Sequence, residues 1–424
     1  MAEQSVSTLV WLAQSAPLVA LLCYVGYQWR NLLSCVLVIA ALYSFTKNII
    51  NLLIDSHKLP KSAFPIFLFF DIWMALTKLS NLFLDVSYVR MLLDGIMKRL
   101  KTCPTTNITI HKVNKDLDVY VYKPETVSNK GCVVYIHGGG WCFLSAAGFS
   151  GSVSYMAHYL EMVVVSVEYR LAPEHPFPAG LEDCYSAVQW VQDNCDMLEV
   201  DAESVFVGGD SAGGNLSAAV CMLYRDRQGA PLETAEQSTG SKKRPGIAGQ
   251  ILLYPVLQGF SNCHSSMLEN SSYFPPPDEM PRSVSLYVFG NQRLSKWLGD
   301  PLKIPQKAPK FWKTFVCKAE ERASDLSTIK EVKKLARHAD NATLEEILGN
   351  SYIFPLHAED VRDLPPAYVQ VAAADPLHDE GEWYARYLEE SGNTVVFSVV
   401  KHCHGFMMKY LSLIHISEPT RPER

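Results

Sequence analysis

Ser211 stands between two glycines at a spacing that suits a reactive serine hydroxyl. The stretch Gly209-Asp210-Ser211-Ala212-Gly213 matches the G-x-S-x-G pattern of a nucleophile elbow, in which a sharp strand-to-helix turn lifts a serine into a cleft. Glycines suit this turn because the backbone is strained there and neighbouring elements pass too close for a Cβ atom. The pattern therefore predicts that Ser211 is a nucleophile. A small-residue turn after a strand is the alternative interpretation.

A run of three glycines supplies candidate oxyanion donors. His137-Gly138-Gly139-Gly140-Trp141 directly follows the short apolar run 132–136, and glycines let backbone N–H groups approach a reacting carbonyl closely. The N–H groups that start the helix after the serine point at the same position. We therefore expect the N–H groups of Gly138, Gly139 and Ala212 to bind the oxyanion.

The remaining residues of this loop have a supporting role. His137 precedes the donors, so we expect it to close the loop by hydrogen bonding rather than to take part in catalysis. Gly140 completes the loop. A plain flexible turn is the alternative, but the pairing with a candidate nucleophile favours an oxyanion loop, since acyl transfer needs both.

A serine hydroxyl needs a base to take its proton and an acid to hold that base. In a strand-turn-helix fold of this type the partners follow the serine in the order acid, then histidine, from loops after late strands. Asp375 directly follows the predicted strand 367–371, and His404 follows the predicted strand 394–400. We therefore predict Asp375 and His404 as the partners of Ser211.

Three nearby residues compete for these roles. Asp379 and Glu380 are rival acids, but they resemble the capping turn of the next helix. His402 is a rival base that lies two residues nearer the strand, where it is less able to turn toward the serine.

Short apolar strands alternate with helices along most of the chain, a pattern typical of an α/β fold with a parallel, doubly wound sheet. The predicted strands are 108–113, 117–122, 132–136, 162–167, 204–207, 250–255, 367–371 and 394–400, and the predicted helices are 180–194, 215–223 and 380–391. Residues 225–246 are polar and predict a surface loop. Residues 258–355 break the alternation, which predicts a lid or substrate-binding cap inserted in a body spanning 107–410.

The first part of the chain is apolar. Leu9–Tyr27 is uncharged and long enough to cross a bilayer. Asn31–Thr46 is a shorter uncharged run that either crosses the bilayer, lies in its interface or packs on the body. We expect residues 1–55 to be an uncleaved membrane anchor, with a cleaved signal peptide as the alternative. Residues 56–106 predict membrane-proximal or cap helices, including a helix over 73–91; a helix buried against the body is the alternative.

The composition excludes several classes of protein. The chain has 424 residues and a formal net charge of −6, so it offers no basic patch for nucleic acid. Its 11 cysteines are scattered, without CxxC or zinc-like spacing. We expect no metal, no organic cofactor and no obligate protein partner.

Four motifs in order give the chain a family resemblance. The stretches 137–141, 169–174 (Tyr-Arg-Leu-Ala-Pro-Glu), 208–214 and 375–377 resemble the hormone-sensitive-lipase family of α/β-hydrolases, and the apolar start with Trp141-Cys142 is most similar to its arylacetamide deacetylase-like members. The resemblance implies an α/β-hydrolase with a helical cap that acts as a serine esterase. It also implies an anchor in the endoplasmic reticulum membrane and a lumenal catalytic domain.

The resemblance has consequences for the substrate and for modification. It implies a small apolar ester, or an amide of an aromatic amine, delivered from the lipid membrane. Asn107, Asn270 and Asn341 begin glycosylation tripeptides, whereas a fourth tripeptide at Asn215 lies on the predicted elbow helix and is discounted. A lipase for acylglycerols or sterol esters, and a non-catalytic ligand-binding protein on the same fold, are the alternatives.

The last residues depart from the family pattern. The stretch 411–424 resembles the translation of a common sequencing-library adapter rather than the expected closing helix. We therefore expect a non-native tail there, and His415 is no candidate base.

Overall fold

The computed structural model describes part of the chain in detail. The described residues are 66, 69–70, 73–74, 86–227, 244–258, 265–271, 273–277, 279–292, 295 and 349–411. The chain divides into two compact units, residues 1–89 and 90–424. Within the first unit, the rings of Phe69, Phe70 and Trp73 contact one another, with centroids 5.6 to 6.0 Å apart.

The predicted membrane anchor lies outside the described residues. Both apolar runs, Leu9–Tyr27 and Asn31–Thr46, fall in the part of the chain that carries no structural description. Among the helices that are described, none is both long enough and apolar enough to span a bilayer. Most of the predicted cap and the predicted non-native tail also lie outside, so these domain assignments stay predictions.

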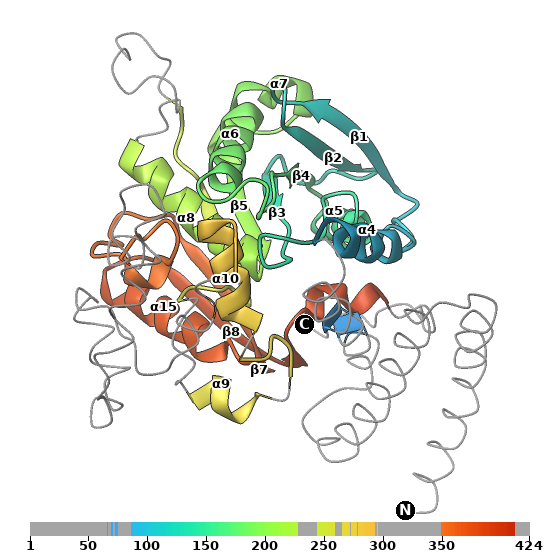
Figure 1. Ribbon diagram of the computed structural model, residues 1–424. Helices are drawn as coiled ribbons and strands as arrows, with labels where there is room; N and C mark the ends of the chain where they lie inside the picture. Colours follow the sequence, from blue (N-terminus) through green and yellow to red (C-terminus); the bar gives the residue numbers. More distant parts are fainter. Residues whose placement is uncertain are drawn as a thin grey trace, which may run out of the picture. The chain divides into compact units, whose positions relative to one another are not determined.

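The second unit is built on one sheet of eight strands (Figure 1). The strands are β1 (Thr106–Lys112), β2 (Asp118–Pro124), β3 (Cys132–Ile136), β4 (Val163–Glu168), β5 (Val205–Asp210), β6 (Gly249–Leu253), β7 (Ala367–Ala374) and β8 (Val395–Cys403). Their order across the sheet is β1-β2-β4-β3-β5-β6-β7-β8. β1 and β2 are antiparallel to their neighbours, and β3 to β8 pair in parallel. The predicted mostly parallel sheet is thus confirmed.

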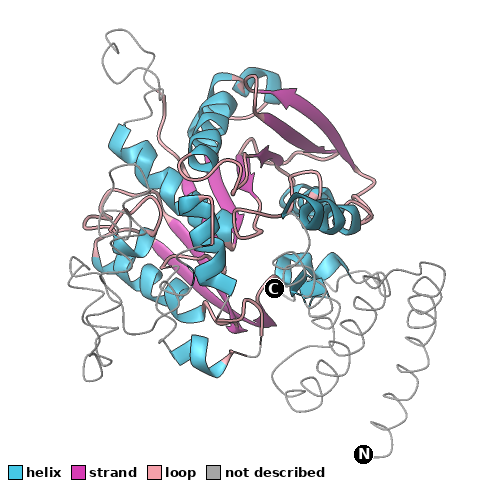
Figure 2. Ribbon diagram, viewed as in Figure 1, coloured by secondary structure: helices cyan, strands magenta, loops and turns pink. Residues whose placement is uncertain are grey.

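Helices lie on both sides of the strands (Figure 2). The described helices are α4 (Val86–Met97), α5 (Ser150–Leu160), α6 (Ala179–Asp193), α7 (Cys195–Leu198), α8 (Ala212–Arg227), α9 (Ser265–Glu269), α10 (Glu279–Phe289) and α15 (His378–Glu390), with short 3₁₀ helices at η2 (Ala202–Ser204), η5 (Pro355–His357) and η6 (Phe406–Leu411). α6 and α8 pack together beside the central strands, partly through the rings of Tyr185 and Tyr224. α5 packs against β1, β2 and β4, and α15 packs against β7 and β8.

The core lies at the centre of the sheet. All five residues of β3 are buried, as are five of the six residues of β4 and of β5. These strands are short and rich in valine, because a parallel strand that is covered on both faces buries consecutive apolar side chains rather than alternate ones.

The structure corrects three details of the predicted elements. α5 was not predicted, because serines such as Ser152 and Ser154 occupy its buried face and hide the apolar period. α8 runs to Arg227, so the predicted loop cannot begin at Arg225. α4 continues to Met97, six residues beyond the predicted end at Met91, because Leu92, Leu93 and Met97 extend its apolar face.

Candidate active site

The carboxyl ends of the parallel strands bring the predicted site residues to one edge of the sheet. His137 directly follows β3, Ser211 follows β5, Asp375 follows β7 and His404 follows β8. Chain segments up to 267 residues apart in sequence therefore meet where open α/β sheets bind their ligands.

Ser211 occupies a tight turn between β5 and α8. Its φ angle is +54°, a left-handed conformation that a non-glycine residue seldom adopts. Neighbouring backbone holds this conformation in place: the Ser211 N–H donates to the Leu253 carbonyl at 2.9 Å, and the Ser211 carbonyl accepts from the Val256 N–H at 3.2 Å. Strained backbone at a functional position persists only when its surroundings determine it in this way.

The two glycines of the turn are required by close backbone contacts. A Cβ atom on Gly209 would lie 2.2 Å from the Ile136 carbonyl oxygen, and one on Gly213 would lie 1.9 Å from the same oxygen. Any side chain at either position would therefore overlap the end of β3. The close approach predicted from the sequence is confirmed.

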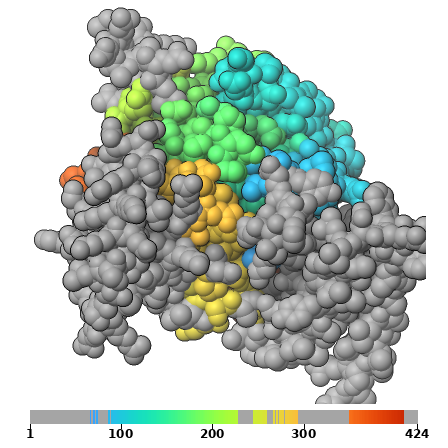
Figure 3. Space-filling model, in the orientation of Figure 1, coloured from blue at the N-terminus to red at the C-terminus, as the bar shows by residue number. Residues whose placement is uncertain are grey.

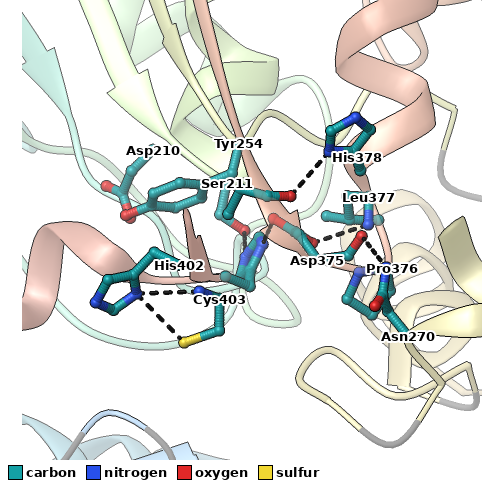
Figure 4. Close-up of polar contacts among 12 residues, drawn as sticks. Asp210, Ser211, Tyr254, Asn270, Asp375, Pro376, Leu377, His378, His402 and Cys403 are labelled. Carbon is teal, nitrogen blue, oxygen red and sulfur yellow. Dashed lines mark hydrogen bonds and ion pairs between the residues drawn. The ribbon is translucent and has the colours of Figure 1, made fainter. Parts of the chain in front are cut away.

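Ser211, His404 and Asp375 form a continuous hydrogen-bonded line (Figure 4). His404 Nε2 lies 2.9 Å from Ser211 Oγ, and His404 Nδ1 lies 2.8 Å from Asp375 Oδ2. Asp375 and His404 are both buried. The second carboxylate oxygen, Asp375 Oδ1, accepts the Leu377 N–H at 2.8 Å. With its Nδ1 proton donated to Asp375, His404 presents the Nε2 lone pair to the serine hydroxyl.

The rival residues make other contacts. In Figure 4, His402 points away from Ser211, and its Nδ1 accepts the Cys403 N–H at 3.0 Å. Asp379 and Glu380 lie in the first turn of α15, as predicted. Asp379 Oδ2 accepts the Ser266 N–H at 2.9 Å.

Glu380 is held by the backbone segment that follows β6 in the chain. Its Oε2 accepts the N–H groups of Leu257 and Gln258 at 2.7 and 2.9 Å. A buried carboxylate that accepts hydrogen bonds from two backbone N–H groups holds the segment that carries them in place. The two rival acids thus join α15 to the segments that follow β6.

One predicted oxyanion donor is wrong. The Gly138 N–H already donates to Asp210 Oδ1 at 2.8 Å, so it cannot also bind an oxyanion. Among the described residues, no acceptor takes the N–H of Gly139, Gly140 or Ala212. Gly140, predicted only as a supporting residue, therefore carries a free donor.

His137 supports the loop as predicted. Its ring is fully buried, stacks on Tyr169 with centroids 4.4 Å apart, and donates from Nδ1 to the Gly138 carbonyl at 2.7 Å. Burial lowers the pKa of His137 to about 4, so the ring is neutral at pH 7. The Tyr169 hydroxyl in turn donates to the His137 carbonyl at 2.9 Å.

Comparison of the sequence with known proteins identifies the family of this chain. The profile of the α/β-hydrolase fold family matches residues 133–351 and 326–408. The chain belongs to this family. It is 31% identical to arylacetamide deacetylase from Bos taurus over 326 residues, which is 72% of this chain and 77% of the relative. It is 30% identical to carboxylesterase NlhH from Mycobacterium tuberculosis over 284 residues, 67% of this chain and 68% of that protein.

Solved structures agree. The hyperthermophilic esterase from the archaeon Pyrobaculum calidifontis superposes with a TM-score of 0.53 at 29% identity, covering 80% of this chain and 91% of its own. The predicted resemblance to the hormone-sensitive-lipase group and its arylacetamide deacetylases is confirmed. This hydrolase is accordingly a carboxylic ester hydrolase.

Three side chains that brace the candidate active site of the hydrolase could not be predicted from the sequence. Asp210 holds Gly138, as described above. Asn215 on α8 accepts from Trp141 Nε1 at 3.3 Å and donates to the Ile353 carbonyl at 2.9 Å. For Asp210 and Asn215, the only available signal in the sequence was a polar residue among the apolar and small residues that flank Ser211.

Arg90 on α4 is the third. Its Nε donates to the Cys142 carbonyl at 2.9 Å, and its guanidinium also donates to the Ala172 carbonyl and forms an ion pair with Glu174. Arg90 therefore connects the residue after the oxyanion loop with the Tyr-Arg-Leu-Ala-Pro-Glu loop. No local pattern marks this arginine, because its partners lie 52 to 84 residues away.

Aromatic side chains from the cap region approach the site. Tyr287 on α10 stacks on Trp141, with centroids 4.6 Å apart and planes 6° from parallel. The ring of Phe274 lies 5.9 Å from that of His404. In Figure 3 the gold atoms of residues 279–292 adjoin the green body. Aromatic rings therefore contact both the predicted oxyanion loop and the predicted base.

The described residues contain no cluster of histidine, cysteine, aspartate and glutamate side chains that could hold a metal ion. The cysteines of the described region are all free thiols. The expectation of a hydrolase without a cofactor stays a prediction.

Proposed function

We propose that this hydrolase cleaves apolar carboxylic esters and arylamides by double displacement through an acyl-enzyme on Ser211. The observation that carries the proposal is the position of His404, whose two ring nitrogens contact Ser211 and Asp375 at 2.9 and 2.8 Å. A neutral imidazole held between a hydroxyl and a carboxylate acts as base for the first and is stabilised by the second once it is protonated.

The first half-reaction forms the acyl-enzyme. Ser211 Oγ attacks the substrate carbonyl carbon while its proton moves to His404 Nε2. The carbonyl oxygen becomes an oxyanion and accepts the N–H groups of Gly139, Gly140 and Ala212, which have no other acceptor among the described residues. Collapse of this intermediate breaks the bond to the leaving alcohol or amine, which takes the proton from His404.

The second half-reaction releases the acid. Water gives a proton to His404 Nε2 and attacks the acyl carbon, and the same N–H groups bind the second oxyanion. Collapse breaks the bond to Ser211 Oγ, which recovers the proton, and the carboxylic acid leaves. Asp375 keeps the His404 ring oriented in both halves and needs no proton of its own.

The substrate class is drawn from the site and from the relatives. The ring of Phe274 lies 5.9 Å from that of His404 and offers an aromatic contact beside the proposed base, and Trp141 of the oxyanion loop is buried against Tyr287. Named relatives include arylacetamide deacetylase and an arylesterase from Saccharolobus solfataricus. Both the contacts and these names favour aromatic or apolar acyl and leaving groups.

We also propose that the chain is anchored in the endoplasmic reticulum membrane with a lumenal catalytic domain. The apolar runs before residue 55 and the family resemblance support this arrangement. Asn107 is exposed on β1 and can accept a glycan, whereas Asn270 donates to the Asp375 carbonyl and Asn215 is buried. Sensitivity to an endoglycosidase that is lost in Asn107→Gln is expected; an unglycosylated chain that carbonate extracts from membranes would contradict the proposal.

The test of the reaction is labelling with a fluorophosphonate, which phosphonylates activated serines. The parent chain, Ser211→Ala, His404→Ala and His402→Ala are compared after each is shown to be folded by circular dichroism. Labelling lost in the first two variants and kept in His402→Ala is expected, followed by turnover of p-nitrophenyl esters and of an acetanilide. A folded parent without labelling would overturn the mechanism and favour a ligand-binding protein.

A further inference from the structure

We propose that Asp210 is a positioning residue whose carboxylate ties the oxyanion loop, the nucleophile turn and the His404 loop to one point. The proposal rests on the reaction proposed above and adds to it. Asp210 precedes Ser211 in the chain and is the last residue of β5. Its side chain is 1% exposed.

Three donors converge on this carboxylate. Asp210 Oδ1 accepts the Tyr135 hydroxyl at 2.6 Å and the Gly138 N–H at 2.8 Å, and Oδ2 accepts the Tyr254 hydroxyl at 3.3 Å. The salt bridges found in the described part of the chain include none with Asp210. Its charge is therefore stabilised chiefly by hydrogen bonds. Burial makes such an arrangement unfavourable, and proteins retain it where it fixes a geometry.

The first of these bonds orients the oxyanion loop. Asp210 takes the Gly138 N–H, and the backbone bends directly after this anchored residue, at Gly139 (φ +122°) and Gly140 (φ +58°). The N–H groups of Gly139 and Gly140 have no acceptor among the described residues. The fit is close, since a Cβ atom on Gly138 would lie 2.5 Å from Asp210 Oδ2. An oxyanion hole depends on such fixed donors, which cost no reorganisation during the reaction.

The second connection reaches the base. The hydroxyl of Tyr254 accepts the Met407 N–H at 3.4 Å while it donates to Asp210, and the Tyr254 ring lies edge-on to His404 with centroids 4.7 Å apart. Figure 4 shows Asp210 and Tyr254 adjacent to each other on the Ser211 side of the site. A shift of the Asp210 carboxylate would therefore move both the oxyanion donors and the loop that carries His404.

The electrostatics agree with this geometry. Burial raises the pKa of Asp210, and the hydrogen bonds from Tyr135 and Gly138 and the charge of protonated His404 act in the opposite direction. The carboxylate is thus stabilised by the same groups that it positions.

The test compares Asp210→Ala with Asp210→Asn. The amide keeps an oxygen that accepts from Gly138, whereas alanine leaves that N–H and both tyrosine hydroxyls without their acceptor. Steady-state kcat and KM are measured with a p-nitrophenyl ester, per site titrated by fluorophosphonate. Binding of a trifluoromethyl ketone, which forms an oxyanion on the serine, is measured alongside.

For Asp210→Ala we expect kcat to fall about 10²- to 10³-fold with KM nearly unchanged, as for loss of an oxyanion donor. Trifluoromethyl ketone affinity should fall in parallel, and Asp210→Asn should recover at least tenfold of the loss. If Asp210→Ala fails to fold, Asp210→Asn and Tyr135→Phe serve instead. Both variants should lower the affinity for the trifluoromethyl ketone by a larger factor than that by which they raise KM.

Asp183→Asn is the control for a purely structural loss, since Asp183 is a buried carboxylate whose hydrogen bonds go to Arg170 and to none of the proposed triad or oxyanion donors. It should lower the melting temperature without changing kcat per titrated site. Asp210 variants that behave in the same way, with ketone affinity unchanged, would overturn the proposal. That result would leave Ser211 labelling intact, so it is distinguishable from failure of the proposed reaction.

Discussion

The proposed nucleophile and the proposed base of this hydrolase are held by different kinds of structure. Ser211 follows β5, which has hydrogen-bonded neighbours, β3 and β6, on both sides and is buried at five of its six positions. His404 follows β8, the last strand of the sheet, where Val396 is 56% exposed and Val399 is 49% exposed. One proposed catalytic residue therefore belongs to the centre of the sheet and the other to its edge.

The difference determines what fixes each residue. At the centre, backbone packs on backbone so closely that Gly209 and Gly213 have no room for a side chain. At the edge, side chains fix the base: Asp375 binds one ring nitrogen, and the rings of Tyr254 and Phe274 approach the imidazole. We therefore expect the centre to be intolerant of any added atom and the edge to depend on a few specific contacts.

The largest effect should come from removing the contact that orients the base. Asp375→Asn should lower kcat about 10⁴-fold, because the amide can stabilise the wrong imidazole tautomer. The variant should remain folded, since the oxygen of its side-chain amide can still accept the Leu377 N–H. Asp379→Asn is the matched control and should change kcat less than about threefold, as a substitution outside the hydrogen-bonded line. Equal losses in the two variants would contradict the assignment of the acid.

At the centre, Gly213→Ala should destabilise the protein by about 3 kcal/mol or more, because the new methyl group would overlap the Ile136 carbonyl. Gly392→Ala is the control: its φ is +91°, but nothing lies within 4 Å of a Cβ there, so only the backbone strain of about 1–2 kcal/mol applies. Urea denaturation measures both. A smaller loss for Gly213→Ala than for Gly392→Ala would show that the centre can relax.

The end of β4, beside the central strands, carries a half-buried carboxyl group. Burial raises the pKa of Glu168, at the end of β4, from 4.5 to about 7. Ionisation of Glu168 is thus less favourable in the folded state than in the unfolded state. The resulting loss of folding stability is absent below about pH 4.5 and fully present above about pH 7, where it amounts to roughly 3 kcal/mol.

Glu168→Gln should remove this penalty. The variant should be more stable than the parent by roughly 3 kcal/mol at pH 8.5, and the difference should shrink as the pH falls toward 5. Denaturant titrations at the two pH values measure it. A variant that is less stable than the parent at pH 8.5 would show that the ionised carboxylate has partners strong enough to offset its burial.

The smallest effect is expected at the edge. Val396→Thr on β8 should change stability by less than about 0.5 kcal/mol, whereas the same substitution at the buried Val207 on β5 should cost about 1–3 kcal/mol by burying a hydroxyl. Thermal melts of the two variants compare edge and centre directly. A large loss for Val396→Thr would mean that this edge is covered in solution.

Much of the fold could be predicted from local patterns. The apolar run at 132–136 coincides with β3, and the predicted strands after residue 160 each correspond to an observed strand within a few residues. α5 could not be predicted, because its buried serines satisfy their hydroxyls through contacts such as the one between Ser154 and the Cys103 N–H. That contact exists only once the chain has folded.

The sequence by itself determined the order of the chemistry: a serine in a glycine turn, then an aspartate and a histidine, each directly after an apolar strand. These signals are local, because strand ends and tight turns are specified by the residue types at a few neighbouring positions. Only the tertiary structure decided that Gly138 donates to Asp210 and not to an oxyanion, that His404 and not His402 faces Ser211, and that Arg90 braces the oxyanion loop. Each of these depends on groups far apart in the sequence, whose distance and direction are set by the packing of the sheet.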